Sequence, residues 1–93
     1  MGIVAAIDRT KTEELLAELK AAEAKGHRVS EDEFHHLLNQ VIDNGIATAE
    51  RLWSRFKVSR PMMDRWQRIT APHPFLRKNV MTGLIEEVQA ALQ

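Results

Sequence analysis

One stretch in the second half of the chain constrains the fold most strongly, because it holds two short helical patterns with only a few residues between them. Leu52 and Phe56 lie four residues apart and therefore share one face of a first helix. Met63 and Trp66 lie three residues apart and share one face of a second helix. The stretch AERLWSRFKVSRPMMDRWQR therefore predicts two helices joined by a tight turn.

The residues at this turn fit that interpretation. Val58 is a small apolar residue that can fill the gap between the two helices. Ser59 can cap the second helix, and Pro61 in its first turn removes no hydrogen bond that the helix needs. With the apolar face turned inward, the outward residues of the second helix are Arg60, Asp64, Arg65 and Arg68. A helix exposing arginines beside a tight turn has the layout of an element that enters the major groove of DNA.

Two further helices are predicted before this stretch. Thr10 and Glu13 have the spacing of a capping box, which predicts a helix over 11–24 that ends at Gly26. Its narrow apolar stripe consists of Leu15, Leu16, Leu19 and Ala22. A helix this short needs packing partners to be stable.

The next helix has the clearest amphipathic pattern of the chain. Ser30 and Glu33 form a second capping box at its start, and Asn44 with Gly45 ends it. The core-facing residues are Phe34, Leu37, Leu38, Val41 and Ile42. Thr48 can then cap the helix that reaches Phe56.

A last helix is predicted from Pro74 to about Ala91, after a proline-containing break. Its expected core residues, each four after the last, are Leu76, Val80, Leu84, Val88 and Leu92. Gly83 within it indicates close packing, since glycine costs about 1 kcal/mol against alanine in a helix. The chain is therefore expected to be all-α, with about five short helices, the two-helix stretch at its centre and an extra N-terminal helix.

The domain organisation follows from these elements. We expect a flexible N-terminal arm over residues 1–9 and a single helical domain over 10–93. Within the domain, residues 10–26 form an N-terminal helix suited to dimer contacts, and residues 31–92 form the core around the two-helix stretch. The length suits one modest core, because a chain this small buries only roughly 60–65% of its unfolded surface.

Composition excludes several classes of protein. The chain has no cysteine, and no apolar run approaches the roughly 20 residues needed to span a bilayer, so we expect a cytoplasmic protein without a membrane segment. Adjacent His35 and His36 point about 100° apart on a helix and cannot share a metal as an i, i+4 pair would. No glycine-rich phosphate loop and no nucleophile–base–acid arrangement is recognisable. We expect no enzyme activity, no catalytic or metal-binding residues, no cofactor and no small-molecule substrate.

The neutral net charge conceals an asymmetry between the two halves of the chain. Residues 1–50 hold ten acidic and five basic side chains, whereas residues 51–93 hold three acidic and eight basic ones. A basic half that coincides with the two-helix stretch favours a polyanionic partner there.

The two-helix stretch resembles the helix-turn-helix of the phage-repressor and Cro-like (lambda-repressor-like) family. That pattern has an apolar residue, alanine, two polar residues, an apolar residue, glycine, a small aliphatic residue and serine, which here reads LWSRFKVS from Leu52 to Ser59. Met63, Arg65 and Trp66 then match the second helix of the family. Trp53 and Lys57 depart from the pattern, since the family prefers alanine and a turn glycine there. The resemblance extends more weakly from residue 31 through the last helix.

The resemblance implies a role for particular residues. Arg60 and Arg65 are the candidates for base contacts, because a guanidinium can bridge O6 and N7 of guanine. Ser59 is a candidate for a phosphate or a base. Asp64 is a candidate for cytosine N4, although its spacing from Arg60 and Arg68 favours ion pairs that hold both arginines in place. The candidates for phosphate contacts are Arg51, Arg55, Lys57, Arg68, Arg77 and Lys78.

The expected function is that of a small sequence-specific DNA-binding transcriptional regulator, similar to phage repressors. It would bind double-stranded DNA as a homodimer, with the helix over 59–68 in the major groove. The helix over 11–24 is the first candidate for dimer contacts and the last helix the second. Two alternatives stay open: an all-α adaptor that binds another protein through its Leu15/Leu19 or Trp53 surface, and an accessory protein of phage DNA packaging or replication.

Overall fold

The computed structural model describes residues 8–68 and 71–93, and every secondary-structure element among them is helical. The elements in chain order are α1 (Arg9–Lys25), the short 3-10 helix η1 (Gly26–Arg28), α2 (Glu31–Asp43), α3 (Ala49–Phe56), α4 (Arg60–Arg68) and α5 (Pro74–Ala91). The predicted all-α class with five helices is therefore confirmed. The arm expected over residues 1–9 lies outside the described residues up to position 7, and Asp8 and Arg9 already belong to the start of α1.

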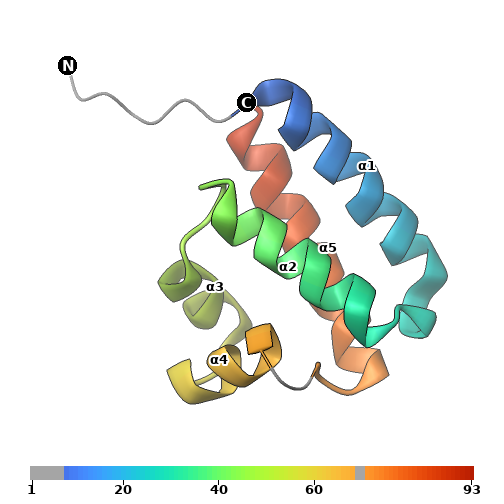
Figure 1. The fold of residues 1–93 in the computed structure, drawn as a ribbon, viewed down its shortest axis with the longest axis vertical. Helices are drawn as coiled ribbons and strands as arrows, with labels where there is room; N and C mark the ends of the chain where they lie inside the picture. Colours follow the sequence, from blue (N-terminus) through green and yellow to red (C-terminus); the bar gives the residue numbers. More distant parts are fainter. Residues whose placement is uncertain (1–7, 69–70) are drawn as a thin grey trace.

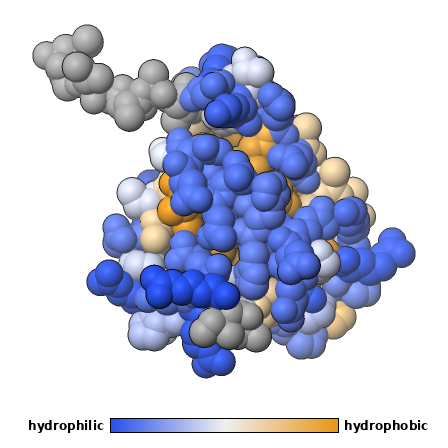
Figure 2. All heavy atoms as spheres, in the orientation of Figure 1, coloured by the Kyte–Doolittle hydropathy of each residue, from blue (hydrophilic) through white to orange (hydrophobic). Residues whose placement is uncertain are grey.

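Two long helices, α1 and α5, run side by side in opposite directions. Helix α2 packs on both and passes in front of α5 in the view of Figure 1. The shorter α3 and α4 lie together at the lower left of the view. The chain ends near the start of α1, where the Arg9 guanidinium donates to the carbonyl oxygen of Leu92 at 3.1 Å. The core lies between the helices, and the face in Figure 2 is largely hydrophilic, with hydrophobic residues visible where helices meet.

The start of α1 differs from the prediction. The carboxylate of Asp8 caps the helix by accepting from the backbone N–H of Lys11 at 3.0 Å. Thr10 lies inside the helix instead of capping it. Asp and Thr both cap well, and the cap two residues earlier adds half a turn of helix. The predicted Thr10–Glu13 capping box is therefore wrong.

The leucine stripe of α1 is part of the core. Leu15, Leu19 and Ala22 are at most 2% exposed, and α1 packs mainly on α5 and also on α2. Polar contacts reinforce this docking, since Lys25 pairs with Glu33 of α2 at 2.9 Å. The chain's own α5 and α2 therefore occupy the stripe, so it is not available for dimer contacts. That this helix makes dimer contacts through its exposed outer face stays a prediction.

The ends of α2 and α3 agree with the sequence. Ser30 accepts from the N–H of Glu33 at 3.1 Å, and Thr48 accepts from the N–H of Arg51 at 3.2 Å. Only half of the second capping box forms, because the Glu33 carboxylate binds Lys25. Gly45, after the C-cap residue Asn44, has a φ of 73°, a conformation that glycine adopts without strain.

Along α5 the predicted core stripe is correct only at its centre. Val80, Leu84 and Val88 are at most 4% exposed, but Leu76 is 49% exposed and Leu92 is half-buried. Each step of four residues advances about 40° beyond a full turn around the helix axis. A stripe of five residues spaced in this way therefore leaves the buried face at both ends. The buried surface of α5 also includes Met81 and Ile85. No helix in the described part of the chain is long and apolar enough to span a membrane.

Candidate nucleic-acid interface

The turn between α3 and α4 is closed by two backbone hydrogen bonds. The N–H of Lys57 donates to the carbonyl of Ser54 at 3.3 Å, and the N–H of Val58 donates to the carbonyl of Trp53 at 3.1 Å. This pair of bonds defines a Schellman motif, which requires a left-handed residue directly after the helix. Lys57 is that residue, with φ 56° and ψ 42°. It therefore adopts a left-handed conformation that glycine takes without strain.

Ser59 begins α4 as predicted. Its hydroxyl accepts from the N–H of Met62 at 3.3 Å, and its carbonyl accepts from the N–H of Met63 at 3.0 Å. Pro61 lies in the first turn, where its missing N–H leaves no bond unmade. The cap fixes where α4 starts and hence which of its side chains face outward.

The inner face of α4 is anchored in the core. Met63 is fully buried and Trp66 is 7% exposed. The Trp66 ring meets the Phe34 ring of α2 edge to face, with centroids 6.3 Å apart and planes at 81°. Leu52 of α3 is also fully buried. The apolar residues that predicted the two-helix unit thus hold α4 against the body.

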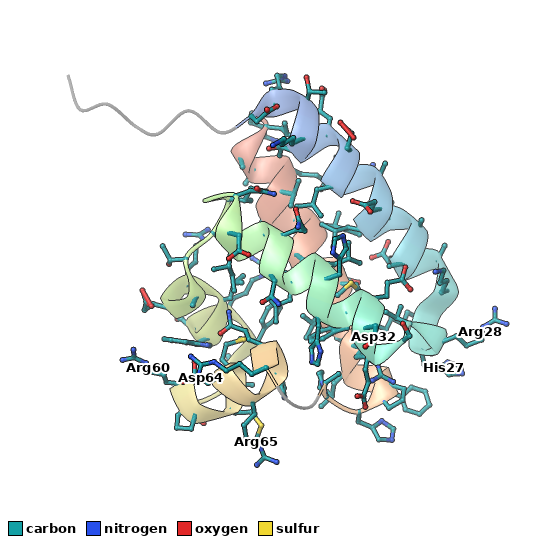
Figure 3. All side chains as sticks on the ribbon, viewed as in Figure 1. His27, Arg28, Asp32, Arg60, Asp64 and Arg65 are labelled. Atoms are coloured by element: carbon teal, nitrogen blue, oxygen red, sulfur yellow. The ribbon has the colours of Figure 1, made fainter. Side chains whose placement is uncertain are left out.

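The outer face of α4 carries the predicted arginines. Arg60, Arg65 and Arg68 are exposed, and Figure 3 shows Arg60 and Arg65 projecting outward from the helix. The Arg60 guanidinium carbon lies 5.3 Å from the centroid of the Trp53 ring, within range of a cation–π interaction. This contact orients Arg60 and gives Trp53, the bulky departure from the family pattern, a role at the surface.

Asp64 does not make the ion pairs that its spacing predicts. It is half-buried on α4, and it forms no ion pair with Arg60 or Arg68 in the described structure. The prediction that it holds both arginines is therefore wrong. Because Arg60 is placed over Trp53, it does not turn toward the carboxylate one turn away.

Two of the predicted phosphate contacts are engaged within the protein. Arg51 donates to Glu87 at 2.6 Å, and Arg55 binds the other oxygen of Glu87 at 3.0 Å and also contacts Glu86. Glu87 is only 5% exposed, so these bonds compensate a buried carboxylate and join α3 to α5. The hydrogen bond with Glu87 raises the pKa of Arg51 further above its usual value, so this guanidinium remains charged.

Neither Glu86 nor Glu87 is among the residues predicted from the sequence. The usable signal was the placement of two adjacent carboxylates in an otherwise apolar part of α5, opposite a helix with arginines four residues apart. A carboxylate whose position in a helix predicts burial needs a basic partner. The distance of more than 30 residues along the chain concealed which arginines supply it.

The remaining phosphate candidates differ in accessibility. Arg77 is 8% exposed and its buried Nε has no hydrogen-bond partner among the described atoms, so it is not placed to contact a duplex. Lys57 is exposed at the turn, and Lys78 is exposed on α5. The exposed basic residues of the candidate set that form no ion pair among the described residues are Lys57, Arg60, Arg65, Arg68 and Lys78.

No group of three or more His, Asp or Glu side chains in the described residues is arranged to hold a metal ion. His73 has a structural position instead, since its Nδ1 accepts from the N–H of Phe75 at 3.4 Å at the start of α5. Comparison with family models, with curated proteins and with solved structures found no match for this chain.

Proposed function

We propose that this protein binds double-stranded DNA sequence-specifically through α4 and acts as a small transcriptional regulator. The observation that carries the proposal is the outer face of α4. Arg60 and Arg65 are exposed there and form no ion pair with a described carboxylate, while Met63 and Trp66 fix the opposite face in the core. A helix held in the core on one side can place the guanidinium groups of its other side against guanine edges in the major groove.

The basic residues around α4 support the same proposal. Lys57 lies at the turn before the helix and Arg68 at its end, so the two flank the base-contacting positions along α4. In DNA-binding helix-turn-helix units such flanking cations bind phosphates and fix the register of the helix. Arg51 and Arg55 are engaged by Glu86 and Glu87, so they are not counted among the proposed phosphate contacts.

The first test is selection of bound fragments from random duplex DNA, followed by measurement of affinity over a range of salt concentrations. We expect an enriched sequence motif and an affinity that falls steeply with salt as phosphate contacts release counterions. A protein that shows no preference among duplexes at low salt would not be a sequence-specific DNA-binding protein.

Two single-charge variants then separate base contacts from phosphate contacts. Arg65→Ala should weaken binding to the selected site by about 1–3 kcal/mol and relax the preference at one base position. Lys78→Ala removes the same charge outside α4, and it should weaken all sequences alike and reduce the salt slope by about 1. Fluorescence anisotropy with the selected duplex and single-base variants measures both. Unchanged sequence preference in Arg65→Ala would contradict the assigned base contact.

A further inference from the structure

The indole of Trp53 and the guanidinium of Arg60 meet across the turn between α3 and α4. Trp53 lies in the second half of α3, and Arg60 is the first residue of α4. The guanidinium carbon lies over the indole, 5.3 Å from the ring centroid. A contact at this distance is attractive, because the face of an aromatic ring is electron-rich. The contact therefore joins a residue of the supporting helix to a candidate base-contacting residue.

Trp53 is itself held by the rest of the protein. Its side chain is half-buried and packs against the hydrophobic core, and its Nε1 atom is buried without a hydrogen-bond partner among the described atoms. Its backbone carbonyl accepts from the N–H of Val58 at 3.1 Å in the turn. A tryptophan side chain also has only two rotatable bonds. The indole therefore offers Arg60 a surface whose position is determined by the packing of α3.

Among the described residues, no carboxylate pairs with Arg60. Asp64, one turn further along α4, makes no ion pair with it. An ion pair would occupy N–H groups of the guanidinium and neutralise its charge. A contact with an aromatic face uses none of these donors in a hydrogen bond, so they stay available for O6 and N7 of guanine. Trp53 can therefore orient Arg60 without competing with a base.

The two candidate base contacts differ in this respect. An arginine side chain has many rotamers, and fixing it against a base costs conformational entropy. For Arg60 part of this cost is met within the folded protein, because the guanidinium already lies over Trp53. In the described structure Arg65 makes no such contact with an aromatic ring. Recognition by Arg60 should therefore depend on Trp53, and recognition by Arg65 should not.

We propose that Trp53 is a positioning residue for sequence recognition, which orients the Arg60 guanidinium toward a guanine edge and so determines the preference at one base position without contacting the DNA. This inference rests on the proposed function, since it concerns how one of the proposed base contacts is made. The helix-turn-helix pattern that this stretch resembles prefers alanine where the chain has Trp53. The arrangement is therefore a feature of this chain and not of the pattern.

The test compares two substitutions at Trp53. Trp53→Leu removes the aromatic face and keeps an apolar side chain against the core, whereas Trp53→Phe keeps an aromatic face. The base position to examine is the one whose preference Arg60→Ala relaxes, measured by fluorescence anisotropy with the selected duplex and its single-base variants. Trp53→Leu should reduce discrimination there by about 5–30-fold, the factor that a cation–π contact contributes as solvent is excluded from it. Trp53→Phe should stay within about threefold of the wild-type protein.

A double-mutant cycle separates positioning from a general effect on α4. In the Arg60→Ala background, Trp53→Leu should change the affinity for the selected duplex by less than about twofold, because the guanidinium that it positions is absent. In the Arg65→Ala background, Trp53→Leu should weaken binding by its full factor. Thermal unfolding verifies that all variants are folded at the temperature of measurement. An equal loss in both backgrounds would overturn the inference, because Trp53 would then support the whole helix or contact the DNA itself.

Failure of this inference differs from failure of the proposed function. Wild-type base preferences that Trp53→Leu leaves intact would overturn the role of Trp53 alone, whereas a wild-type protein without any preference among duplexes would overturn both. A measurement without DNA tests the contact itself. In NMR spectra of the full chain, the ring current of the indole should shift the Arg60 Hδ and Hε resonances upfield, and Trp53→Leu should abolish this shift. Arg60 resonances that do not move in Trp53→Leu would contradict the positioning.

Discussion

Lys57 is in a backbone conformation that is unfavourable for a residue with a side chain. Its φ of 56° and ψ of 42° close the turn between α3 and α4, and a left-handed residue of this kind costs roughly 1–2 kcal/mol when it is not glycine. Lys57→Gly should therefore raise the free energy of unfolding by about 1 kcal/mol, after the greater entropy of glycine in the unfolded chain is allowed for. Urea unfolding followed by circular dichroism measures the change.

Lys57→Ala is the matched control, because it removes the same ammonium group and keeps a side chain in the left-handed conformation. It should leave stability unchanged or lower it slightly. Both variants should weaken DNA binding equally, since the proposed phosphate contact is lost in each. Equal stability of the glycine and alanine variants would show that the turn stores no backbone strain.

Gly83 allows α3 to approach α5 closely. A Cβ atom at this position would lie 2.5 Å from Cε1 and 3.0 Å from Cζ of Phe56 and 3.1 Å from Nε of Arg55. Gly83→Ala should therefore destabilise the protein by about 1–3 kcal/mol through overpacking, against a gain in helix propensity of about 1 kcal/mol. Asn79→Ala, at an exposed position of the same helix, isolates the propensity gain and should not destabilise. A stabilised Gly83→Ala variant would show that the Phe56 ring moves aside without loss.

At the scale of elements, Glu87 joins α3 to α5. Its buried carboxylate accepts hydrogen bonds from both Arg51 and Arg55, whose side chains are 63% and 33% exposed. Solvent around the two guanidinium groups therefore screens both ion pairs. Glu87→Gln should destabilise the protein by about 1–2 kcal/mol, below the 3–5 kcal/mol seen when a fully buried pair is broken. Thermal unfolding measures the loss, and Glu86→Gln at a 57% exposed side chain should change stability much less.

The same substitution has a consequence for binding. Releasing Arg51 and Arg55 from Glu87 frees two guanidinium groups on α3. Glu87→Gln should therefore increase affinity for non-specific duplex DNA and steepen its salt dependence. Unchanged salt dependence would indicate that this side of α3 does not face the duplex.

Local signals were sufficient to predict the elements but not how the long helix faces its neighbours. Ser30, Thr48 and Ser59 cap the helices that they were predicted to cap, because a cap depends on residues within one turn. The prediction that Leu76 lies in the core is wrong, because residues spaced four apart rotate around the helix axis and the ends of such a series leave the buried face. The angle at which a helix packs against its neighbours decides which residues of such a series are buried.

At the scale of the whole molecule, the sequence predicted the exposed arginines of α4 and overestimated the basic surface around them. The apolar spacing of Met63 and Trp66 determines which side of α4 is buried, so Arg60 and Arg65 had to face outward. Whether the Arg51 guanidinium is available for a phosphate contact depends on Glu87, a residue 36 positions away. Such pairs depend on the packing of α3 on α5, and no local pattern contains that information.

The place of α1 in the molecule gives the last prediction. Leu19 is fully buried where α1 packs on α5, so α1 is part of the core and not an appended helix. Leu19→Ala should destabilise the protein by about 2–5 kcal/mol, the usual effect of removing a buried leucine side chain. This is a large share of the roughly 5–14 kcal/mol expected for a domain of this length. Leu76→Ala makes the same chemical change at a 49% exposed site and should cost less than about 1 kcal/mol. Thermal unfolding measures both losses. Equal losses of stability in Leu19→Ala and Leu76→Ala would contradict the burial of Leu19 between α1 and α5.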